Sequence, residues 1–158
     1  MSNKNNIDNK VVDDFGKEWK AFNHQGLENN DLQSAFDSYF HFFPFTNLKD
    51  AEGFDMGCGS GRWAQFVAKK VGFLNCIDPS HLALDQAKLN LVDAANCSLE
   101  CAGVDNNSLK DDSQDFGYSL GVLHHIPDTP LALQSCSKKL KSGAPFLLYL
   151  YYRFDNKP

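Results

Sequence analysis

The sequence has no long hydrophobic run and no excess of positive charge. Its longest apolar stretch, residues 145–152, is far shorter than the ~18–20 residues that a membrane-crossing helix needs. The first ten residues are polar, so we expect no membrane span, no secretory signal and a cytoplasmic protein. Because 15 Lys and Arg stand against 20 Asp and Glu, the formal net charge is −5. A nucleic-acid-binding protein normally carries a basic face, so the composition favours no nucleic-acid partner.

The sequence also lacks the cysteine spacing of a zinc site. None of its five cysteines forms a Cys-x-x-Cys pair, and most fall in apolar stretches. Free cysteine in such surroundings behaves as a small hydrophobic residue. We therefore expect reduced thiols and no metal site.

What is present is an alternation of short apolar runs and helical patterns in a chain of 158 residues, the length of one domain. The runs predict strands at 52–56, 73–77, 97–104, 116–120 and 144–152, with helices between them. Strands that alternate with helices pair in parallel and are covered on both faces. The pattern predicts an α/β sandwich.

A helical segment precedes this alternation. We predict a division of the chain into an N-terminal helical prelude, residues 1–46 with the first ten loose, and a core at residues 47–158. Aromatic residues at helical spacing form one stripe of Phe15, Trp19 and Phe22 and a second of Phe36, Phe40 and Phe43. We interpret the second stripe as core that covers the sheet. For Phe15 and Trp19, a place in the core and a place in a lid over a ligand both stay open.

The most informative segment is the glycine-rich turn that follows the first predicted strand, Asp55-Met56-Gly57-Cys58-Gly59-Ser60-Gly61. Glycine lets a backbone turn sharply and approach a ligand closely, and ligands bind at this end of an open α/β sheet. A nicotinamide-binding fingerprint would need glycine at position 62, where arginine stands, and no Gly-Lys-Ser/Thr of a phosphate loop occurs.

An acid follows at the end of the second predicted strand. Asp78 lies nineteen residues beyond Gly59, the place from which a carboxylate accepts hydrogen bonds from a ribose diol. The alternative interpretation is a tight turn followed by an aspartate near a helix start. The combination of strand, glycine turn, helix and acid favours the nucleoside interpretation.

With these features the chain resembles the class I S-adenosylmethionine-dependent methyltransferases, most closely the small-molecule enzymes of the ubiquinone and menaquinone biosynthesis type. The resemblance covers roughly residues 50–152 and is most specific at 54–61 and 115–128. It implies a Rossmann-like three-layer α/β/α sandwich with a mainly parallel sheet and an N-terminal helical prelude. It also implies S-adenosylmethionine as cofactor, S-adenosylhomocysteine as product and a small-molecule methyl acceptor.

The resemblance further implies a set of cofactor-binding positions. Asp55 and the turn around Cys58 would hold the methionine moiety, and Asp78 would bind the ribose hydroxyls. The complete set is Asp55, Gly57, Cys58, Gly59, Gly61, Asp78, Pro79, Ser80, Val104, Asp105, Leu120 and Gly121. In it, Pro79 and Ser80 would line the adenosine side, Val104 and Asp105 would lie at the adenine, and Leu120 and Gly121 would pass the methionine end.

The adjacent histidines His124 and His125 are the candidate catalytic residues. A sulfonium methyl is already activated, so the protein has mainly to align an acceptor with it, and a base is needed only if the acceptor must lose a proton. Histidine has a suitable pKa for that task. The alternative, which we favour, is that this pair packs against or caps the following loop.

The chain departs from the family in stopping just after the fifth predicted strand, whereas the family has seven. With strands six and seven missing, we expect either a truncated form of a longer protein or a homodimer through the exposed sheet edge. Two functions stay open: a methyltransferase, and a catalytically silent S-adenosylmethionine-binding module that serves a protein partner. A nicotinamide-dependent oxidoreductase is disfavoured by Arg62.

Overall fold

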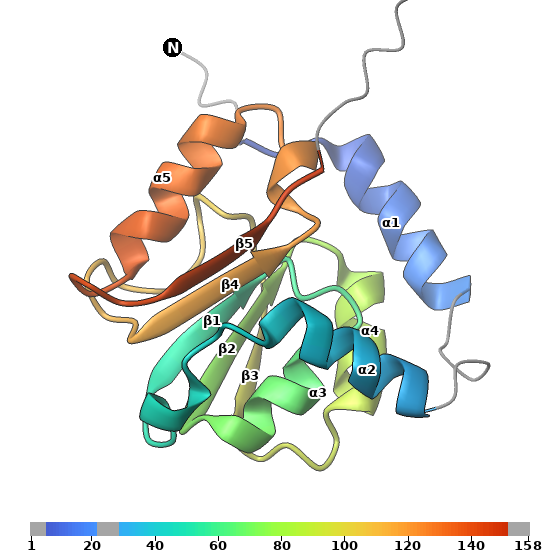
Figure 1. Ribbon diagram of the computed structural model, residues 1–158. Helices are drawn as coiled ribbons and strands as arrows, with labels where there is room; N and C mark the ends of the chain where they lie inside the picture. Colours follow the sequence, from blue (N-terminus) through green and yellow to red (C-terminus); the bar gives the residue numbers. More distant parts are fainter. Residues whose placement is uncertain (1–5, 22–28, 152–158) are drawn as a thin grey trace, which may run out of the picture.

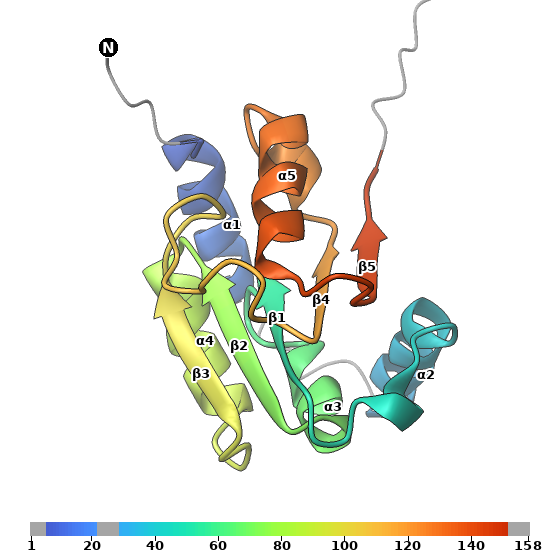
Figure 2. The same ribbon diagram turned by 90° about the vertical axis from the view of Figure 1, so that its left-hand side faces the viewer.

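The computed structural model describes residues 6–21 and 29–151, and the side chains of residues 6–17 and 31–151. Five strands form one sheet: β1 (Glu52–Met56), β2 (Phe73–Asp78), β3 (Cys97–Cys101), β4 (Phe116–Leu120) and β5 (Phe146–Tyr149). Their order is β3-β2-β1-β4-β5, and every neighbouring pair is parallel. Figure 2 shows this order across the sheet, with β1 at its centre. The carboxyl ends of all five strands consequently meet at one edge.

Helices cover both faces of the sheet, which confirms the predicted Rossmann-like α/β/α class. Helix α5 (Thr129–Lys139) lies on one face, and α3 (Ala64–Val67), continued by η2 (Ala68–Lys70), and α4 (His81–Asn90) lie on the other (Figure 2). The N-terminal helices are α1 (Asn9–Ala21) and α2 (Asn29–Phe40), and two further 3₁₀ turns are η1 (Phe45–Asn47) and η3 (Leu123–His125). Figure 1 shows α1 near the carboxyl edge of the sheet and α2 beside α3.

The alternation of side chains along the strands produces two apolar cores. On β1, Phe54 and Met56 face the core beneath α5. On β4, Phe116 and Tyr118 face the opposite core, beneath α2 and α3. Successive strand residues point to opposite faces, so the apolar residues of one strand, taken at every second position, face the same core. This alternation also decides which face receives the polar side chain of Asp55.

The second aromatic stripe belongs to the core, as predicted. Phe36 and Phe40 are buried and stack with their ring centroids 4.6 Å apart, and Phe40 meets the ring of Tyr118 at 5.2 Å. Phe43 lies in the same core. Helix α2 therefore covers the sheet. Phe22 and the Trp19 side chain lie outside the described residues, and the division of the chain at residue 46 stays a prediction.

Two predicted strands are longer than those observed. The third strand ends at Cys101, because the Gly103 amide donates to Asn106 Oδ1 and the chain turns there. The fifth strand spans Phe146–Tyr149 and begins later than predicted, because Ala144 N donates back to Lys141 O in a turn. Helix α5 is capped by Asp128, whose carboxylate accepts from Leu131 N.

The first strand keeps five residues although its amino end is polar. Glu52 N donates to Asp115 Oδ2 at 2.9 Å, and Glu52 Oε1 accepts from Asn75 Nδ2 at 2.9 Å. The same Asn75 group lies 3.2 Å from Oε1 of the buried Gln114. Polar partners on both neighbouring strands thus satisfy this end of β1. Strand β5 forms one edge of the described sheet. Truncation of a longer protein and formation of a homodimer through that edge both stay predictions.

Candidate functional site

A cavity of about 340 Å³ opens at the carboxyl edge of the sheet. Its wall includes the turn after β1, the end of β2, the segment after β3, the segment after β4 and one side of α1. Ligands of open α/β sheets bind at this edge, beside the central strands where the chain order reverses. Here the reversal lies between β1 and β4.

The glycine turn forms the floor of the cavity beside β1. Gly57, Gly59 and Gly61 have φ values of 81°, 53° and 73°, which side-chain-bearing residues rarely adopt. Gly57 N and Cys58 N donate to Ile77 O at 2.8 and 3.1 Å, so the turn is tied to the end of β2. A Cβ atom at Gly57 would clash with Val122 Cγ1. The turn therefore lies directly against the segment that follows β4.

Asp78 joins the end of β2 to both neighbouring backbone turns. One carboxylate oxygen accepts from Gly59 N at 2.9 Å and the other from Ser80 N at 2.8 Å. Burial raises the pKa of Asp78, and these two hydrogen bonds act against the rise. A carboxylate has about four acceptor positions, so Asp78, which lines the cavity, can accept further hydrogen bonds from a ligand.

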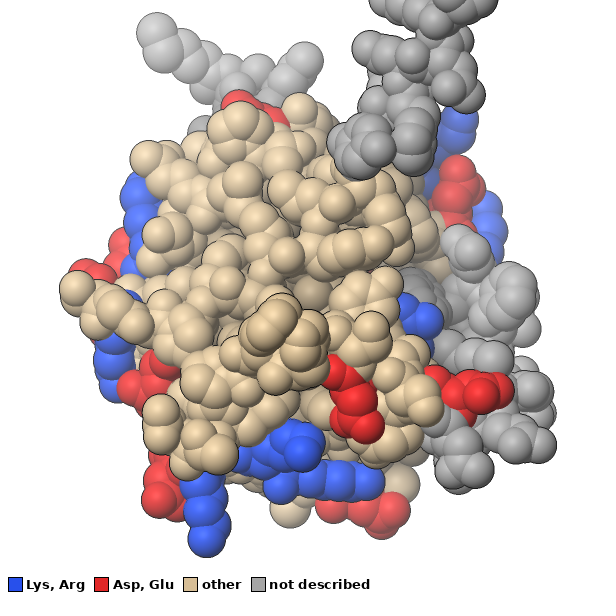
Figure 3. All heavy atoms as spheres, in the orientation of Figure 1, with Lys and Arg blue, Asp and Glu red and all other residues tan. Residues whose placement is uncertain are grey.

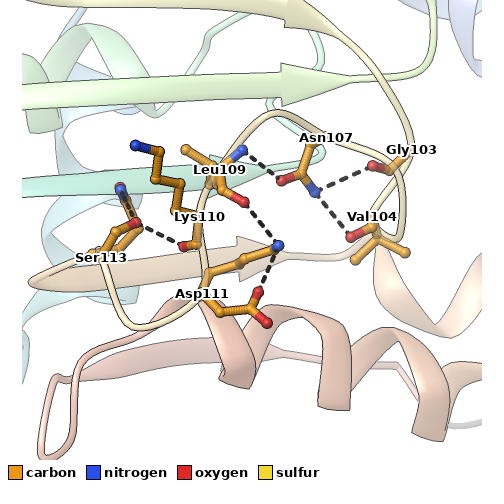
Figure 4. A network of polar contacts seen from close by, with 9 residues as sticks. Gly103, Val104, Asn107, Leu109, Lys110, Asp111 and Ser113 are labelled. Carbon is orange, nitrogen blue, oxygen red and sulfur yellow. Dashed lines mark hydrogen bonds and ion pairs between the residues drawn. The ribbon is translucent and has the colours of Figure 1, made fainter.

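The wall beyond Asp78 consists of small and apolar groups. Pro79 and Ser80 line the cavity, and the Ser80 hydroxyl caps α4 by accepting from Ala83 N. Across from them, Val104 is held by a network in the loop after β3, in which Asn107 Nδ2 donates to the carbonyls of Gly103 and Val104 (Figure 4). Ile77 also lines the cavity. Apolar residues therefore line the cavity near the Asp78 carboxylate.

The opposite end of the cavity lies at the carboxyl end of β4. Leu120 and Gly121 line it, and the Gly121 backbone has a φ of 75°. His125, in η3, also lines it, and burial lowers the pKa of His125. Its ring contacts that of Phe15 with the centroids 5.0 Å apart.

Helix α1 covers the cavity from above, which answers the question left open for Phe15. Val11, Val12 and Phe15 line the cavity. Asn6 ties the preceding segment down: its side chain exchanges two hydrogen bonds of 2.8 Å with the backbone of Asp128. Phe15 therefore belongs to the cover of the cavity, whereas the side chain of Trp19 lies outside the described residues.

Four of the residues predicted for the site do not line the cavity. Asp55 points toward the core beneath α3 and α4, because Phe54 and Met56 occupy the other face of β1. A Cβ atom at Gly61 would lie against Leu91, which follows α4. The two others are Asp105, which is exposed and accepts from Asn6 N, and His124, whose ring packs against Tyr151 and His125.

The buried carboxyl of Asp55 has an unusual protonation state. Burial raises its pKa to about 8, and Asp78 adds to the rise while the neighbouring Tyr118 hydroxyl acts against it. Its Oδ2 atom is buried without a hydrogen-bond partner. The raised pKa favours the neutral form of Asp55, and its direct contact with a cofactor stays a prediction.

Arg62 is one of the lining residues that were not predicted for the site from the sequence. It is the only Lys or Arg among the described residues of the cavity wall, and its guanidinium carbon lies 4.2 Å from the ring centroid of Trp63. Its position directly after Gly61 was the sequence signal that could have placed Arg62 at the site. Within residues 6–21 and 29–151, no three His, Cys, Asp or Glu side chains are arranged to hold a metal ion.

Comparison with known proteins agrees with this geometry. A family model described as a methyltransferase domain matches residues 54–148. The chain belongs to the class I S-adenosylmethionine-dependent methyltransferases. Family membership implies the use of S-adenosylmethionine.

Two relatives show how far the sequence similarity of this methyltransferase chain extends. A tRNA U34 carboxymethyltransferase from Aliarcobacter butzleri is 33% identical over 111 residues, which are 66% of this chain and 35% of the relative. A ubiquinone biosynthesis O-methyltransferase from Nitrosomonas europaea is 29% identical over 99 residues, 61% of this chain and 42% of the relative. The methyltransferase chain thus spans well under half the length of these two curated relatives.

Solved structures share the fold of this methyltransferase. One is an S-adenosylmethionine-dependent methyltransferase from Mesorhizobium loti, with a TM-score of 0.64 and 23% identity over 74% of this chain and 53% of that one. Another is phosphoethanolamine N-methyltransferase 1 from Haemonchus contortus in complex with phosphoethanolamine and S-adenosylhomocysteine. Its TM-score is 0.67 and its identity 16%, over 89% of this chain and 32% of that one.

Proposed function

We propose that this chain binds S-adenosylmethionine in the cavity at the carboxyl edge of the sheet and transfers its methyl group to a small-molecule acceptor. The observation that carries the proposal is Asp78: a carboxylate that lines the cavity, is oriented by the Gly59 and Ser80 amides and keeps acceptor positions for a diol. The relatives are named for tRNA in one case and for ubiquinone biosynthesis in the other, so the acceptor is not transferred from them.

The other walls fit the remaining parts of the cofactor. Val104 and Pro79 are apolar residues of the cavity wall, and apolar side chains suit the flat ring of adenine. The glycine turn brings backbone close to the cavity at Gly57, where a Cβ atom would find no room. When bound, the cofactor supplies an electrophilic methyl group. The residues of the chain bind it, orient it and exclude water through the cover formed by α1.

His125 is our candidate for a proton acceptor, for the case in which the methyl acceptor must lose a proton. It lines the cavity at the end of β4, and burial favours its neutral form, which can take a proton. His124 does not line the cavity and is not proposed for this role. Replacement of His125 by Ala is expected to lower turnover while cofactor affinity changes little.

Calorimetric titration with S-adenosylhomocysteine tests the cofactor site. Replacement of Asp78 by Ala should weaken binding by about 1–3 kcal/mol, because hydrogen bonds to a charged group contribute this much. The matched control is Asp85→Ala on the exposed side of α4, where the carboxylate pairs with Lys88 in solvent. The control should bind as the unchanged protein does.

A second comparison separates loss of the diol contact from a disturbed turn. The Asp78→Ala change should weaken adenosine binding more than 2′,3′-dideoxyadenosine binding, since only adenosine presents the diol. An equal loss for both nucleosides would remove the ribose assignment. Transfer of labelled methyl into the small-molecule fraction of a cell extract would distinguish an enzyme from a silent binding module.

A further inference from the structure

A cluster of aromatic and polar side chains adjoins the methyl-transfer end of the cavity, beyond the part assigned to the cofactor. Tyr151 and Trp63 line the cavity. From them the ring contacts continue outward: Trp63 to Tyr39 at 5.3 Å, Tyr39 to Tyr149 at 5.1 Å, and Tyr149 to Tyr151 at 5.0 Å. We call these four residues, with Arg62, the aromatic subsite.

The aromatic subsite lies where an acceptor must approach. The ring of Tyr151 lies 3.4 Å from the position that a Cβ atom of Gly121 would occupy, at the end of β4. Figure 1 shows the carboxyl ends of β4 and β5 side by side at the cavity edge of the sheet. Tyr149 and Tyr151 are 37% and 54% exposed, so a molecule from solvent can reach them. The subsite is therefore both open and next to the proposed methyl group.

Arg62 contributes a guanidinium to the subsite. Burial lowers the pKa of Arg62, and the nearby Tyr39 and Tyr151 hydroxyls oppose this effect. Burial raises the pKa of Tyr39, and the hydroxyls of Tyr151 and Tyr149 add to the rise. Three phenolic groups and one guanidinium consequently converge, and a guanidinium is suited to bind a carboxylate with two parallel hydrogen bonds.

Four aromatic rings alone would also suit a cationic amine. Arg62 argues against that occupant, because its guanidinium already lies over the Trp63 ring and would repel a second cation. Figure 3 shows basic and acidic residues mixed around the rim of the face that it draws, so charge of one sign does not dominate that face. An anion with an aromatic body suits both the guanidinium and the rings.

We propose that the aromatic subsite binds the methyl acceptor and that this acceptor is an aromatic carboxylate, its ring against Tyr151 and Trp63 and its carboxylate at Arg62. The proposal rests on the proposed function of the cavity, since the acceptor must lie beside the cofactor. It narrows the acceptor from any small molecule to one chemical class.

Three probes of similar shape and different charge test the proposal: benzoate, benzyl alcohol and benzylamine. Each is titrated by nuclear magnetic resonance into the full chain saturated with S-adenosylhomocysteine. Benzoate should bind at least tenfold more tightly than the other two, because a charge-assisted hydrogen bond to a guanidinium contributes a factor of this order. Equal binding of the three probes, or preference for benzylamine, would overturn the proposal.

Substitutions assign the effect to residues. Arg62→Met should reduce benzoate affinity about tenfold or more, to the level of benzyl alcohol. The matched control is Lys69→Met, which removes another cation over a ring, that of Phe66, outside the cavity. The control should leave benzoate affinity unchanged. Tyr151→Ala, at an exposed residue whose loss should not prevent folding, should also weaken benzoate binding.

The cofactor itself carries a carboxylate, and Arg62 could serve that group instead. Binding of S-adenosylhomocysteine and of 5′-methylthioadenosine, which lacks the amino acid part, distinguishes the two. If Arg62→Met weakens the first and spares the second, Arg62 belongs to the cofactor and the acceptor proposal is wrong. If both nucleosides bind to Arg62→Met as to the unchanged protein while benzoate affinity falls, the proposal stands. If the unchanged protein does not bind S-adenosylhomocysteine, the proposed function itself is wrong.

Discussion

The raised pKa of Asp55 is expected to make the stability of this protein depend on pH in an unusual direction. The pKa of Asp55 is raised to about 8 in the folded chain, against an ordinary value of 3.8. Between these two values the unfolded chain has lost the proton that the folded chain keeps. The contribution of Asp55 to the free energy of unfolding therefore falls as the pH rises from about 4 to about 8, whereas most native aspartates have the opposite effect. Replacement of Asp55 by Asn removes this dependence.

The magnitude follows from the difference between the two pKa values. Each pH unit in this range corresponds to about 1.4 kcal/mol of unfolding free energy for one proton. Between pH 5 and pH 7, the stability of Asp55→Asn relative to the unchanged protein should therefore rise by about 3 kcal/mol. Asparagine has nearly the same shape as aspartic acid and carries no charge, so the packing against Tyr118 is kept.

Urea denaturation at pH 5, 6 and 7 measures this relative stability, with the unfolding free energy extrapolated to water. The control is Asp93→Asn, at an exposed carboxylate, and its stability relative to the unchanged protein should not change with pH over this range. A difference between Asp55→Asn and the unchanged protein that is constant from pH 5 to pH 7 would show that Asp55 is ionised in the native state. The account of its burial would then be wrong.

Two further substitutions test the turn and the core. Gly57→Ala should abolish most S-adenosylhomocysteine binding and destabilise the fold by more than Gly143→Ala. Both glycines have a φ of 81°, but only Gly57 has Val122 beside it. Equal thermal unfolding of the two variants would contradict the predicted clash. Phe36→Ala should lower the unfolding free energy by about 3–5 kcal/mol, because the side chain is 1% exposed, whereas Phe42→Ala, at 87% exposed, should change it little; chemical denaturation of both variants measures the contrast.

The strand and helix pattern was predictable because it depends on neighbours in the sequence. The class of fold, the extent of β1 and β4, and the burial of Phe36 and Phe40 follow from periodicity and are confirmed. Strands β3 and β5 are shorter than predicted. A hydrogen bond in the turn after β3 ends that strand, and a hydrogen bond in the turn before β5 delays its start. Apolar composition continues past those turns and carries no signal of them.

The composition of the cavity wall was predictable only in part. Pro79, Val104 and Leu120 line the cavity as expected, while Asp105 is turned away by its bond to Asn6. The place of Asn6 could not be predicted, because its partner Asp128 is 122 positions away. Arg62 was read only as evidence against another fingerprint, although its position after the turn indicated a place at the ligand.

The glycine turn, the acid at the end of the next strand and the order of strands and helices can be predicted from the amino-acid sequence, because each depends mainly on residues close in the chain. Which polar groups face the cavity and which are buried beneath it depends on long-range packing. Asp55 and Asp78 are both aspartates at the ends of adjacent parallel strands. Burial in the core raises the pKa of the first, whereas the second lies at the cavity wall. A sequence pattern does not record that difference in environment.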